Sequence, residues 1–539
     1  MSAYYEEPFT PAEAAILGRF FTNTDRPVFG LINLPEVVKG ALFARYSRTH
    51  KSVRRLFLDE FVANADLGIE AIAATLQNED SIIKFRRAEE LYDRVFFEYG
   101  DDSVAQLGGV HLACEQASNV LTKVLEWGRI AAYLEQSTRY IAYDRPLGER
   151  YRYFIPDEIK DAGLGDSFTE YMEQIFTFYS KAVERLVDHF AAIYPQQTAD
   201  SDFVWRSTIR AKAYDTVRGI LPAATQSNVG IYGTGQAYEM ALVRMQAHPL
   251  TEVRTYGAMM LDELRKQIPA FMKRVDLPER GIAWSNYLAA SAGAMADIAG
   301  SLDEQPEETD EVTLVDWDQD AELKIAAAAL YASTGLPDAQ LLRHVERLPI
   351  EERARILRAY VGDRSNRRHK PGRAMERVSY RFDILSDYGA FRDLQRHRML
   401  TIEWQRLTTR FGYDTPVEVA EAGLLDEWDA LMQRASVLSE QVRAASNADV
   451  AQYVVPFAFR IRYMIEMNAR EAFHLLELRT QPAGHPSYRR VCQEMHRQIR
   501  DVAGHEIIAD AMQFVDYSDP GLERLNEERR LEAKRATRE

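Results

Sequence analysis

The sequence predicts an α+β fold that is mostly helical and is arranged as two tandem halves. Three observations support this prediction. The chain has 539 residues, more than a single hydrophobic core usually holds. Most of it carries apolar residues at three- and four-residue steps, as amphipathic helices do. A similar ordered series of motifs also occurs twice, and an internal repeat of this kind decides how the whole fold is divided.

An acidic segment separates the two halves. Residues 301–311 are rich in Asp and Glu, contain one proline and offer little apolar surface to bury, as in a solvated linker. The predicted domains are therefore half one at 1–300, the linker at 301–311 and half two at 312–539. Half two opens with an alternating segment at 312–317, which predicts a strand, followed by a helix over 320–333.

Helical spacing also precedes the main motif of each half. In half one it runs over 104–124, with a helix start at Asp101 or Asp102. In half two it runs over 378–389. Short strands are expected at 151–155 and 453–455. The charged tail, 521–539, predicts a frayed surface helix.

Composition excludes several classes of protein. The net charge of −16 argues against a nucleic-acid or acidic-membrane partner. The only cysteines, Cys114 and Cys492, do not make a disulfide framework and favour a reducing, cytoplasmic location. No secretory signal pattern stands at the N-terminus, and no apolar run approaches the roughly 20 residues of a membrane span.

Half two carries a cluster of basic residues followed by a helical series. Two guanidinium groups and an imidazole are consecutive at Arg396, His397 and Arg398. Such a cluster suits a pyrophosphate, because guanidinium groups bind phosphate oxygens in pairs; a lone Arg-His-Arg would more often be a solvated turn. The later series is Asn468, Arg470, His474 and Arg479, in which Arg470 and His474 share a helix face.

Half one carries a different subset of the same series. After Arg129 comes a loop with Gln136, Ser137 and Arg139, whose hydroxyl, backbone N–H groups and guanidinium could hold a phosphate. Arg218 follows, four residues before Pro222, and Arg244 stands near the end of the next helix. The alternative for Ser137 and Arg139 is an ordinary turn with a surface ion pair.

Taken in order, these motifs resemble the flavin-dependent thymidylate synthases. That family carries Arg-His-Arg, then Ser-x-Arg, an Arg just before Leu-Pro, Asn-x-Arg, a His and Leu-Arg. The resemblance covers nearly the whole chain as two subunit-like halves that form a pseudo-dimer. It implies flavin contacts at Arg396, His397, Arg398, Asn468, Arg470, His474 and Ser103. It implies nucleotide contacts at Arg129, Gln136, Ser137, Arg139 and Arg218. Arg244 and Arg479 match the catalytic arginine that lies against the uracil ring.

Each half also departs from the family pattern. In half two, Arg406 stands where the family has Ser, Thr408 and Arg410 come two residues late, and Gln452 replaces the arginine before the proline step. In half one, Trp127 and Gly128 replace Arg and His, residues 233–235 replace Asn-x-Arg, and Glu239 replaces the later His. The losses fall on the substrate side of half two and the cofactor side of half one.

The resemblance therefore implies an enzyme that methylates dUMP with methylenetetrahydrofolate. FAD would carry the hydride, NADPH would be the reductant, and no metal is expected. Half two would bind the flavin and half one the nucleotide, and a homodimer would resemble the family's tetramer. Two alternatives remain open: a flavoenzyme acting on another pyrimidine nucleotide, and a catalytically dead nucleotide-binding scaffold.

Overall fold

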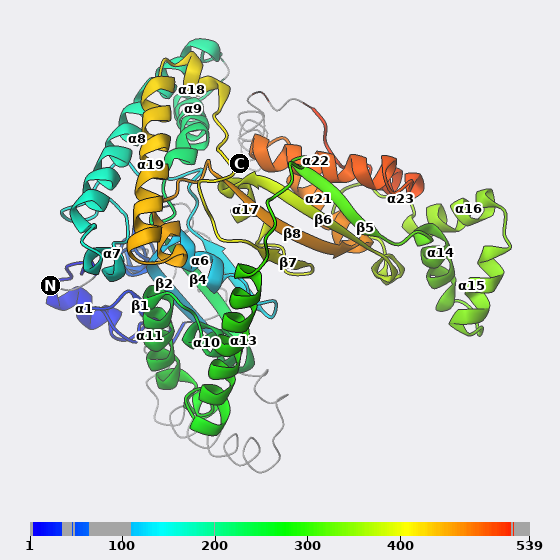
Figure 1. Ribbon diagram of the computed structural model, residues 1–539, viewed down its shortest axis with the longest axis horizontal. Helices are drawn as coiled ribbons and strands as arrows, with labels where there is room; N and C mark the ends of the chain where they lie inside the picture. Colours follow the sequence, from blue (N-terminus) through cyan, green and yellow to red (C-terminus); the bar gives the residue numbers. More distant parts are fainter. Residues whose placement is uncertain are drawn as a thin grey trace. The chain divides into compact units, whose positions relative to one another are not determined.

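The computed structural model describes residues 4–34, 42, 46, 49–63, 109–198, 200–518 and 521 (Figure 1). The described chain is mostly helical and holds two four-stranded antiparallel sheets, which confirms the predicted α+β class. None of its described helices is both long and apolar enough to cross a membrane.

The chain divides into two compact units, and each takes segments from both halves. Unit 1 comprises residues 1–182, 221–305 and 429–455. Unit 2 comprises residues 183–220, 306–428 and 456–539. The boundary between Gln305 and Pro306 lies inside the acidic segment. Arg218, in half one of the sequence, therefore belongs to unit 2.

The two sheets have the same strand order. In unit 1 the order is β1 (Val28–Gly30), β2 (Gly109–Ser118), β4 (Gln226–Thr234), β3 (Ala131–Glu135). In unit 2 it is β5 (Val312–Trp317), β6 (Ser379–Asp387), β8 (Arg460–Asn468), β7 (Thr401–Trp404). In both sheets the segments that follow the two central strands carry the arginine motifs identified in the sequence.

Helices follow these central strands in the same places. A seven-residue helix follows the first, α6 (Asn119–Leu125) or α17 (Tyr388–Leu394), and a longer one follows the second, α10 (Gly235–Gln246) or α21 (Ala469–Arg479). The next helices are α11 (Thr251–Gln267) and α22 (Pro486–Asp501). Other described helices are α1 (Pro11–Leu17), α3 (Val53–Leu56), α7 (Asp157–Asp161), α8 (Gly165–Ile193), α9 (Asp202–Val217), α12 (Pro269–Met272), α13 (Ala283–Gly300), α14 (Ala321–Tyr331), α15 (Asp338–Glu346), α16 (Ile350–Val361), α18 (Val417–Glu421), α19 (Leu425–Ala445), α20 (Ala448–Ala451) and α23 (Glu506–Ala511).

The helices predicted over 104–124 and 378–389 are wrong for most of the residues that the structure describes there. Residues 109–118 and 379–387 are strands, and only α6 and the start of α17 are helical. Strand β2 is buried along almost all its length, so its apolar residues show no two-residue alternation. Strand β6 does alternate, with Tyr380, Phe382 and Ile384 buried, and the three- and four-residue spacing hid this pattern. Residues 101–108 lie outside the described part of the chain.

Other predicted elements divide between confirmed and wrong. The strand at 312–317 and the helix after it, α14, are confirmed. The strands at 151–155 and 453–455 are wrong: Tyr153 makes an isolated bridge to Thr225, and residues 452–454 form a 3₁₀ turn. The tail beyond Gly521 lies outside the described residues.

The same buried contact joins sheet and helix in both units, with the two residue types exchanged. In unit 1 the N-cap of α6 is Ser118, whose hydroxyl donates to the Glu252 carboxylate on α11 at 2.6 Å. In unit 2 the N-cap of α17 is Asp387, which accepts a hydrogen bond from the Ser487 hydroxyl on α22. Each unit thus pairs one carboxylate with one hydroxyl at this buried contact, because a polar group buried there without a hydrogen-bond partner would be costly.

In unit 1 this contact also fixes the segment 429–455. The Tyr453 hydroxyl donates to Glu252 Oε2 at 2.7 Å, and the Ser118 N–H donates to Glu252 Oε1 at 2.9 Å. Burial nevertheless raises the pKa of the Glu252 carboxyl to about 7, because these hydrogen bonds only partly offset its desolvation.

Glu252 should make stability depend on pH. Its folded pKa lies above its unfolded value of 4.5, so its contribution is fully present below pH 4.5 and is lost as pH rises toward 7. Over that range the free energy of unfolding should fall by about 1.4 kcal/mol per pH unit through this group. We expect Glu252→Gln to remove this slope in urea denaturation at pH 5, 6 and 7. The control Glu304→Gln, at an exposed site, should keep the wild-type slope, and equal slopes in all three proteins would contradict the assignment.

Candidate functional site

The basic motif of half two lies in the turn directly after α17. That helix ends at Leu394, so residues 395–398 leave the helical path and their side chains can diverge. His397 is buried, Arg396 is half-buried and Arg398 is exposed. The motif therefore stands at a helix end, as predicted.

Arg479 at the end of α21 makes contact with this motif. Its Nε–H donates to His397 Nε2 at 2.9 Å, and a second N–H donates to the backbone carbonyl of Asp393. Because an arginine can only donate, His397 Nε2 must be the unprotonated nitrogen of a neutral ring. Its Nδ1–H then donates to Glu471 Oε1, 3.1 Å away.

Glu471 joins two imidazoles. Its second oxygen lies 3.2 Å from His474 Nδ1, and the His397 and His474 rings are 5.3 Å apart between centroids. Burial lowers the pKa of His397 to about 4, against the raising effect of Glu471. Burial would raise the pKa of Glu471, but the hydrogen bonds from both histidines outweigh it and lower that pKa to about 2. The carboxylate thus stays ionised and fixes both rings.

The three groups could be taken for a metal site. Ligand atoms of His397, Glu471 and His474 lie within 4.8 Å of one another. However, the Arg479 N–H occupies the lone pair of His397 Nε2, and Nδ1 carries the proton given to Glu471. His397 therefore has no free lone pair for a cation, and the cluster is a hydrogen-bonded relay.

Asp393 brings a residue of half one to the same place. Its Oδ2 lies 3.3 and 3.4 Å from two nitrogens of Arg218, and its Oδ1 lies 3.7 Å from Arg479. Arg218 is only 3% exposed, and its Nε lies 3.8 Å from Asp215. The Nε2 atom of His485 lies 3.3 Å from the backbone carbonyl oxygen of Asp215. Two carboxylates thus compensate the buried Arg218, and one of them is shared with Arg479.

Accessible donors lie beside this relay on α21. The side chains of Arg470 and His474 are 39% and 45% exposed. Arg470 donates to the Pro371 carbonyl at 3.0 Å and lies 3.2 Å from Glu376. Asn468 is the N-cap of α21, its side-chain oxygen accepting the Glu471 N–H at 2.9 Å. Its side-chain amide remains as a donor, while the oxygen has a structural task.

In unit 1 the corresponding places have different chemistry. Arg244 at the end of α10 stacks on Trp127, with the guanidinium carbon 5.0 Å from the ring centre. Burial lowers the pKa of Arg244, and no ion pair to it exists within the described residues. Glu239, which stands in place of the family His, is paired with Arg274 at 2.9 Å. Aromatic stacking here takes the place of the relay of unit 2.

The predicted phosphate loops form the same local turn in both units. The Arg139 N–H donates to the Ser137 hydroxyl at 3.2 Å, and the Arg410 N–H donates to the Thr408 hydroxyl at 3.4 Å. The two-residue shift seen in the sequence therefore leaves the turn intact. Arg129 is exposed just before strand β3.

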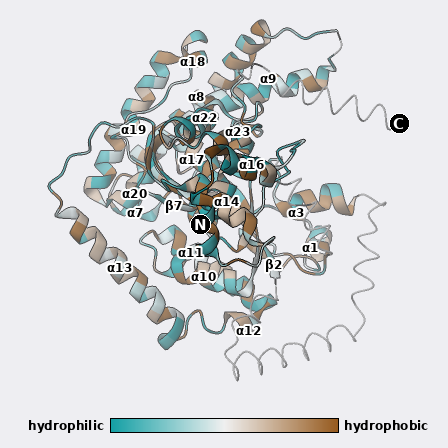
Figure 2. Ribbon diagram, turned by 90° about the vertical axis from the view of Figure 1, so that its right-hand side faces the viewer, coloured by the Kyte–Doolittle hydropathy of each residue, from teal (hydrophilic) through white to brown (hydrophobic). Residues whose placement is uncertain are grey.

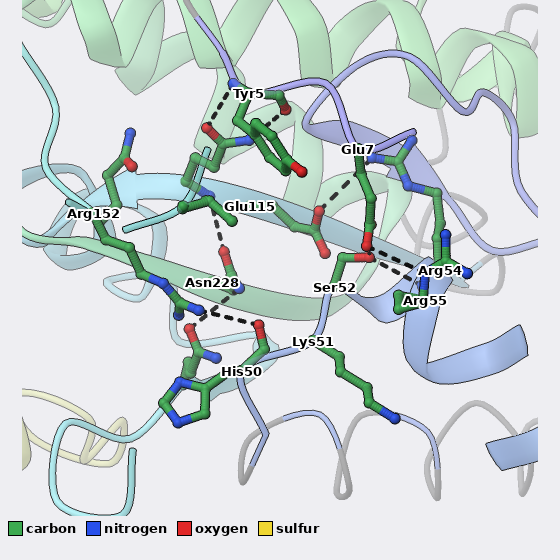
Figure 3. Close-up of a pocket in the computed structure, with 14 residues that line it drawn as sticks. Tyr5, Glu7, His50, Lys51, Ser52, Arg54, Arg55, Glu115, Arg152 and Asn228 are labelled. Atoms are coloured by element: carbon green, nitrogen blue, oxygen red, sulfur yellow. Dashed lines mark hydrogen bonds and ion pairs between the residues drawn. The ribbon is translucent and has the colours of Figure 1, made fainter. Parts of the chain in front are cut away.

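A cavity of about 210 Å³ opens beside Gln136 in unit 1 (Figure 3). Gln136 donates to the Thr49 carbonyl at 2.5 Å and accepts from the Asn228 side chain at 3.2 Å. Gln116 lies at a β-bulge of β2 and has a φ of 57°. Its backbone N–H donates a hydrogen bond to the Asn228 side-chain oxygen at 2.9 Å. A left-handed glutamine is costly, so the surrounding hydrogen bonds must hold this wall of the cavity.

The cavity walls are strongly charged. Arg54 and Arg55 are compensated, the first by the buried Glu115 at 3.8 Å and the second by Glu13 at 2.6 Å. Arg152 differs: it donates to the His50 carbonyl at 3.3 Å, and within the described chain it makes no ion pair (Figure 3). A guanidinium without a carboxylate, facing a cavity, suits an anion.

The predicted site residues thus form separate groups. Unit 2 brings together His397, His474, Arg479 and Arg218, while Gln136, Ser137, Arg139, Arg129 and Arg244 lie in unit 1. Ser103 lies outside the described residues. Sequence reasoning missed Asp393 and Glu471. Glu471 had a signal, since Asn468 and Glu471 have the spacing of a capping box; Asp393 had none beyond its nearness to Arg396.

Comparisons with known proteins agree with the repeated motifs. The family model described as thymidylate synthase complementing protein matches residues 58–270 and 313–504. A UPF0159 protein of Chlamydia muridarum is 37% identical over 532 residues, covering 98% of this chain and 99% of that protein. A flavin-dependent thymidylate synthase of Clostridium tetani is 28% identical over 210 residues, covering 38% of this chain and 75% of that enzyme.

Among solved structures, a UMP/dUMP methylase, PolB from Streptomyces cacaoi bound with 5-Br dUMP, matches with 17% identity and a TM-score of 0.30. The match covers 40% of this chain and 99% of that one. The two segments that the family model matches, residues 58–270 and 313–504, together cover most of the chain and contain both motif series. The chain therefore belongs to the thymidylate synthase complementing protein family, which is the family of the flavin-dependent thymidylate synthases.

Proposed function

We propose that this protein is a flavin-dependent thymidylate synthase-like enzyme that methylates dUMP with methylenetetrahydrofolate. The observation that carries the proposal is the arrangement in unit 2, where Arg479 donates to both His397 and Asp393 and Asp393 also pairs with Arg218. Three motif residues far apart in the sequence are thereby held in one hydrogen-bonded group.

Arg479 is the proposed contact to the pyrimidine ring. His397 and the Asp393 backbone hold its guanidinium from two sides, so it is oriented before a substrate arrives. A fixed cation beside O2 and N3 of a uracil favours the ionised ring and lowers its pKa. The ionised ring can then attack carbon through C5 without an enzymic nucleophile. Arg244 is the second candidate for this role in half one.

Half two is proposed to bind the FAD. Arg396, Arg398, Asn468, Arg470 and His474 offer guanidinium, amide and imidazole donors from the turn after α17 and from α21, and this donor set fits a pyrophosphate-bearing group. His397 would take part by holding Arg479 and Glu471 in place, since both of its ring nitrogens are already hydrogen-bonded. Ser103 is proposed as a further contact. When bound, FAD would carry the hydride, with NADPH as the reductant. The chain's own part is to bind and orient it.

Half one is proposed to bind the nucleotide phosphate through Arg129, Gln136, Ser137, Arg139 and Arg218. The turn at Ser137 and the cavity cation Arg152 support an anion site in unit 1. Arg218 would contribute within unit 2, where a nucleotide would have to share it with Asp393. We further propose tandem subunit-like halves as a pseudo-dimer, a homodimer of such chains, and a cytoplasmic location.

The cofactor assignment can be tested by colour. The double variant Arg396→Ala, His474→Ala should be folded but should lose its flavin, because each charge-assisted contact contributes roughly 1.5–3 kcal/mol. The measurement is the flavin absorption spectrum, with release of FAD on denaturation. Arg443→Ala, at an exposed pair with Glu440, is the control and should keep the flavin. A colourless wild type would favour the scaffold, and full retention in the double variant would overturn the residue assignment.

The nucleotide assignment can be tested by calorimetry with dUMP. Arg139→Ala should weaken binding about tenfold or more, because it removes a charge-assisted contact to phosphate. Arg218 is buried between two carboxylates, so Arg218→Lys is the safer variant: it keeps the charge and loses the bidentate geometry. Neither change should release the flavin.

Thr408→Ala is the matched control for the nucleotide test, since it removes the same kind of turn hydroxyl from half two. Its effect on dUMP affinity should be small. If Thr408→Ala abolished binding while Arg139→Ala had no effect, the assignment of the nucleotide to half one would be reversed. Tight binding of UMP with none of dUMP would instead favour an enzyme of another pyrimidine nucleotide.

A further inference from the structure

Helix α13 is an apolar helix that the described residues of unit 1 leave almost entirely exposed. In Ala283–Gly300 only Ser285 is buried, and only Asp297 carries a charge. Ser285 fixes the first turn by donating to the Val243 carbonyl at 3.0 Å. The helix is coloured mostly white to brown along its length (Figure 2). A helix without a charged face normally lies against a partner.

The apolar residues of α13 follow a heptad seam. Positions at alternating four- and three-residue steps are Trp284, Leu288, Ser291, Met295 and Ile298, and Leu302 continues the spacing just beyond the helix end. Trp284, Met295, Ile298 and Leu302 are 44%, 60%, 57% and 66% exposed. This spacing is that of the contact positions between two packed helices, and from Trp284 to Ile298 the seam spans about 21 Å at 1.5 Å per residue. The occupant that fits it is another helix.

The seam matches a reversed copy of itself. In an antiparallel pair centred between Ser291 and Met295, the small Ser291 faces the large Met295 of the second helix. Leu288 then faces Ile298, and Trp284 comes opposite the segment just beyond the helix end, where Leu302 lies. A parallel pair would instead place Ser291 against Ser291 and Met295 against Met295, which alternates a void with a crowded layer. Residue size therefore favours the antiparallel, two-fold arrangement.

The flanks and the charge agree with this pairing. Tyr287, 66% exposed, would lie opposite Ala299, and Ala292 opposite Ala294, so the flanking side chains allow close approach of the backbones. The chain as a whole has a net charge of −16, which opposes the approach of a second copy over most surfaces. An 18-residue surface with one charge is a place where two such chains can meet.

We propose that α13 is the self-association surface of this protein and that it pairs antiparallel with α13 of a second copy around a two-fold axis. An isologous contact of this kind closes on itself and yields a dimer. The proposal gives the proposed homodimer a surface, and it is independent of the enzymatic assignment, because its test needs neither flavin nor substrate.

The test is sedimentation equilibrium of the full-length chain. The wild type should be a dimer, and Ile298→Lys should raise the dissociation constant about tenfold or more, because it places a charge in an apolar seam. Ile298→Ala is a milder second variant and should weaken the dimer less. Val437→Lys, at a 60% exposed apolar site on α19, is the matched control and should remain dimeric. Circular dichroism should be the same for all four proteins, since these positions are exposed.

Orientation can be tested by cross-linking under mild oxidation. The double variant Ser291→Cys, Met295→Cys should give a covalent dimer, and Met295→Cys alone should not, because only parallel pairing brings two copies of residue 295 together. Native Cys114 and Cys492 are buried and should not interfere. A monomeric wild type, or an Ile298→Lys variant that dimerises like the wild type, would overturn the proposal and would indicate that α13 packs elsewhere.

Discussion

The buried guanidinium of Arg218 is the constraint on which the candidate site depends. At 3% exposure it must be compensated, and Asp393 and Asp215 do so within unit 2. Asp393 also contacts Arg479, so one carboxylate couples two arginines from distant parts of the chain. Removing either partner would leave a buried charge uncompensated, which is far more costly than the net value of the pair. The ion pair therefore fixes positions more than it adds stability.

His397 extends this constraint toward α21. Its neutral ring accepts a hydrogen bond from Arg479 on one side and donates to Glu471 on the other, so both nitrogens are used. Glu471 in turn holds His474, whose side chain is partly exposed. The buried carboxylate of Glu471 thus holds the buried ring of His397 and the accessible ring of His474, each through one hydrogen bond. This rigidity is what a binding site for a charged ligand requires before the ligand arrives.

The two units solve the same packing problem with different residues. At the end of the first central strand, unit 1 uses Ser118 with Glu252 and unit 2 uses Asp387 with Ser487. The helix after the second central strand, α10 or α21, ends near an arginine in both units. In unit 1 this Arg244 stacks on Trp127, while in unit 2 Arg479 donates a hydrogen bond to His397. The backbone plan is retained and the chemistry differs. That pattern is consistent with two halves that have taken different tasks on one architecture.

The sequence alone determined the family, the mostly helical α+β class and the acidic segment that holds a unit boundary. It also determined that Arg479 and the basic motif lie at helix ends. Short motifs with fixed spacing carry such information because local geometry preserves it. It did not determine the central strands β2 and β6. Strand β2 is buried on both faces and lacks the alternation that identifies a strand, and the alternation of β6 was hidden by apolar residues at three- and four-residue steps. Nor could the sequence assign residues 183–220 to unit 2 or pair Arg218 with Asp393, which are 175 residues apart. Such contacts are selected by burial and charge compensation across the whole fold, so only the tertiary structure decided them.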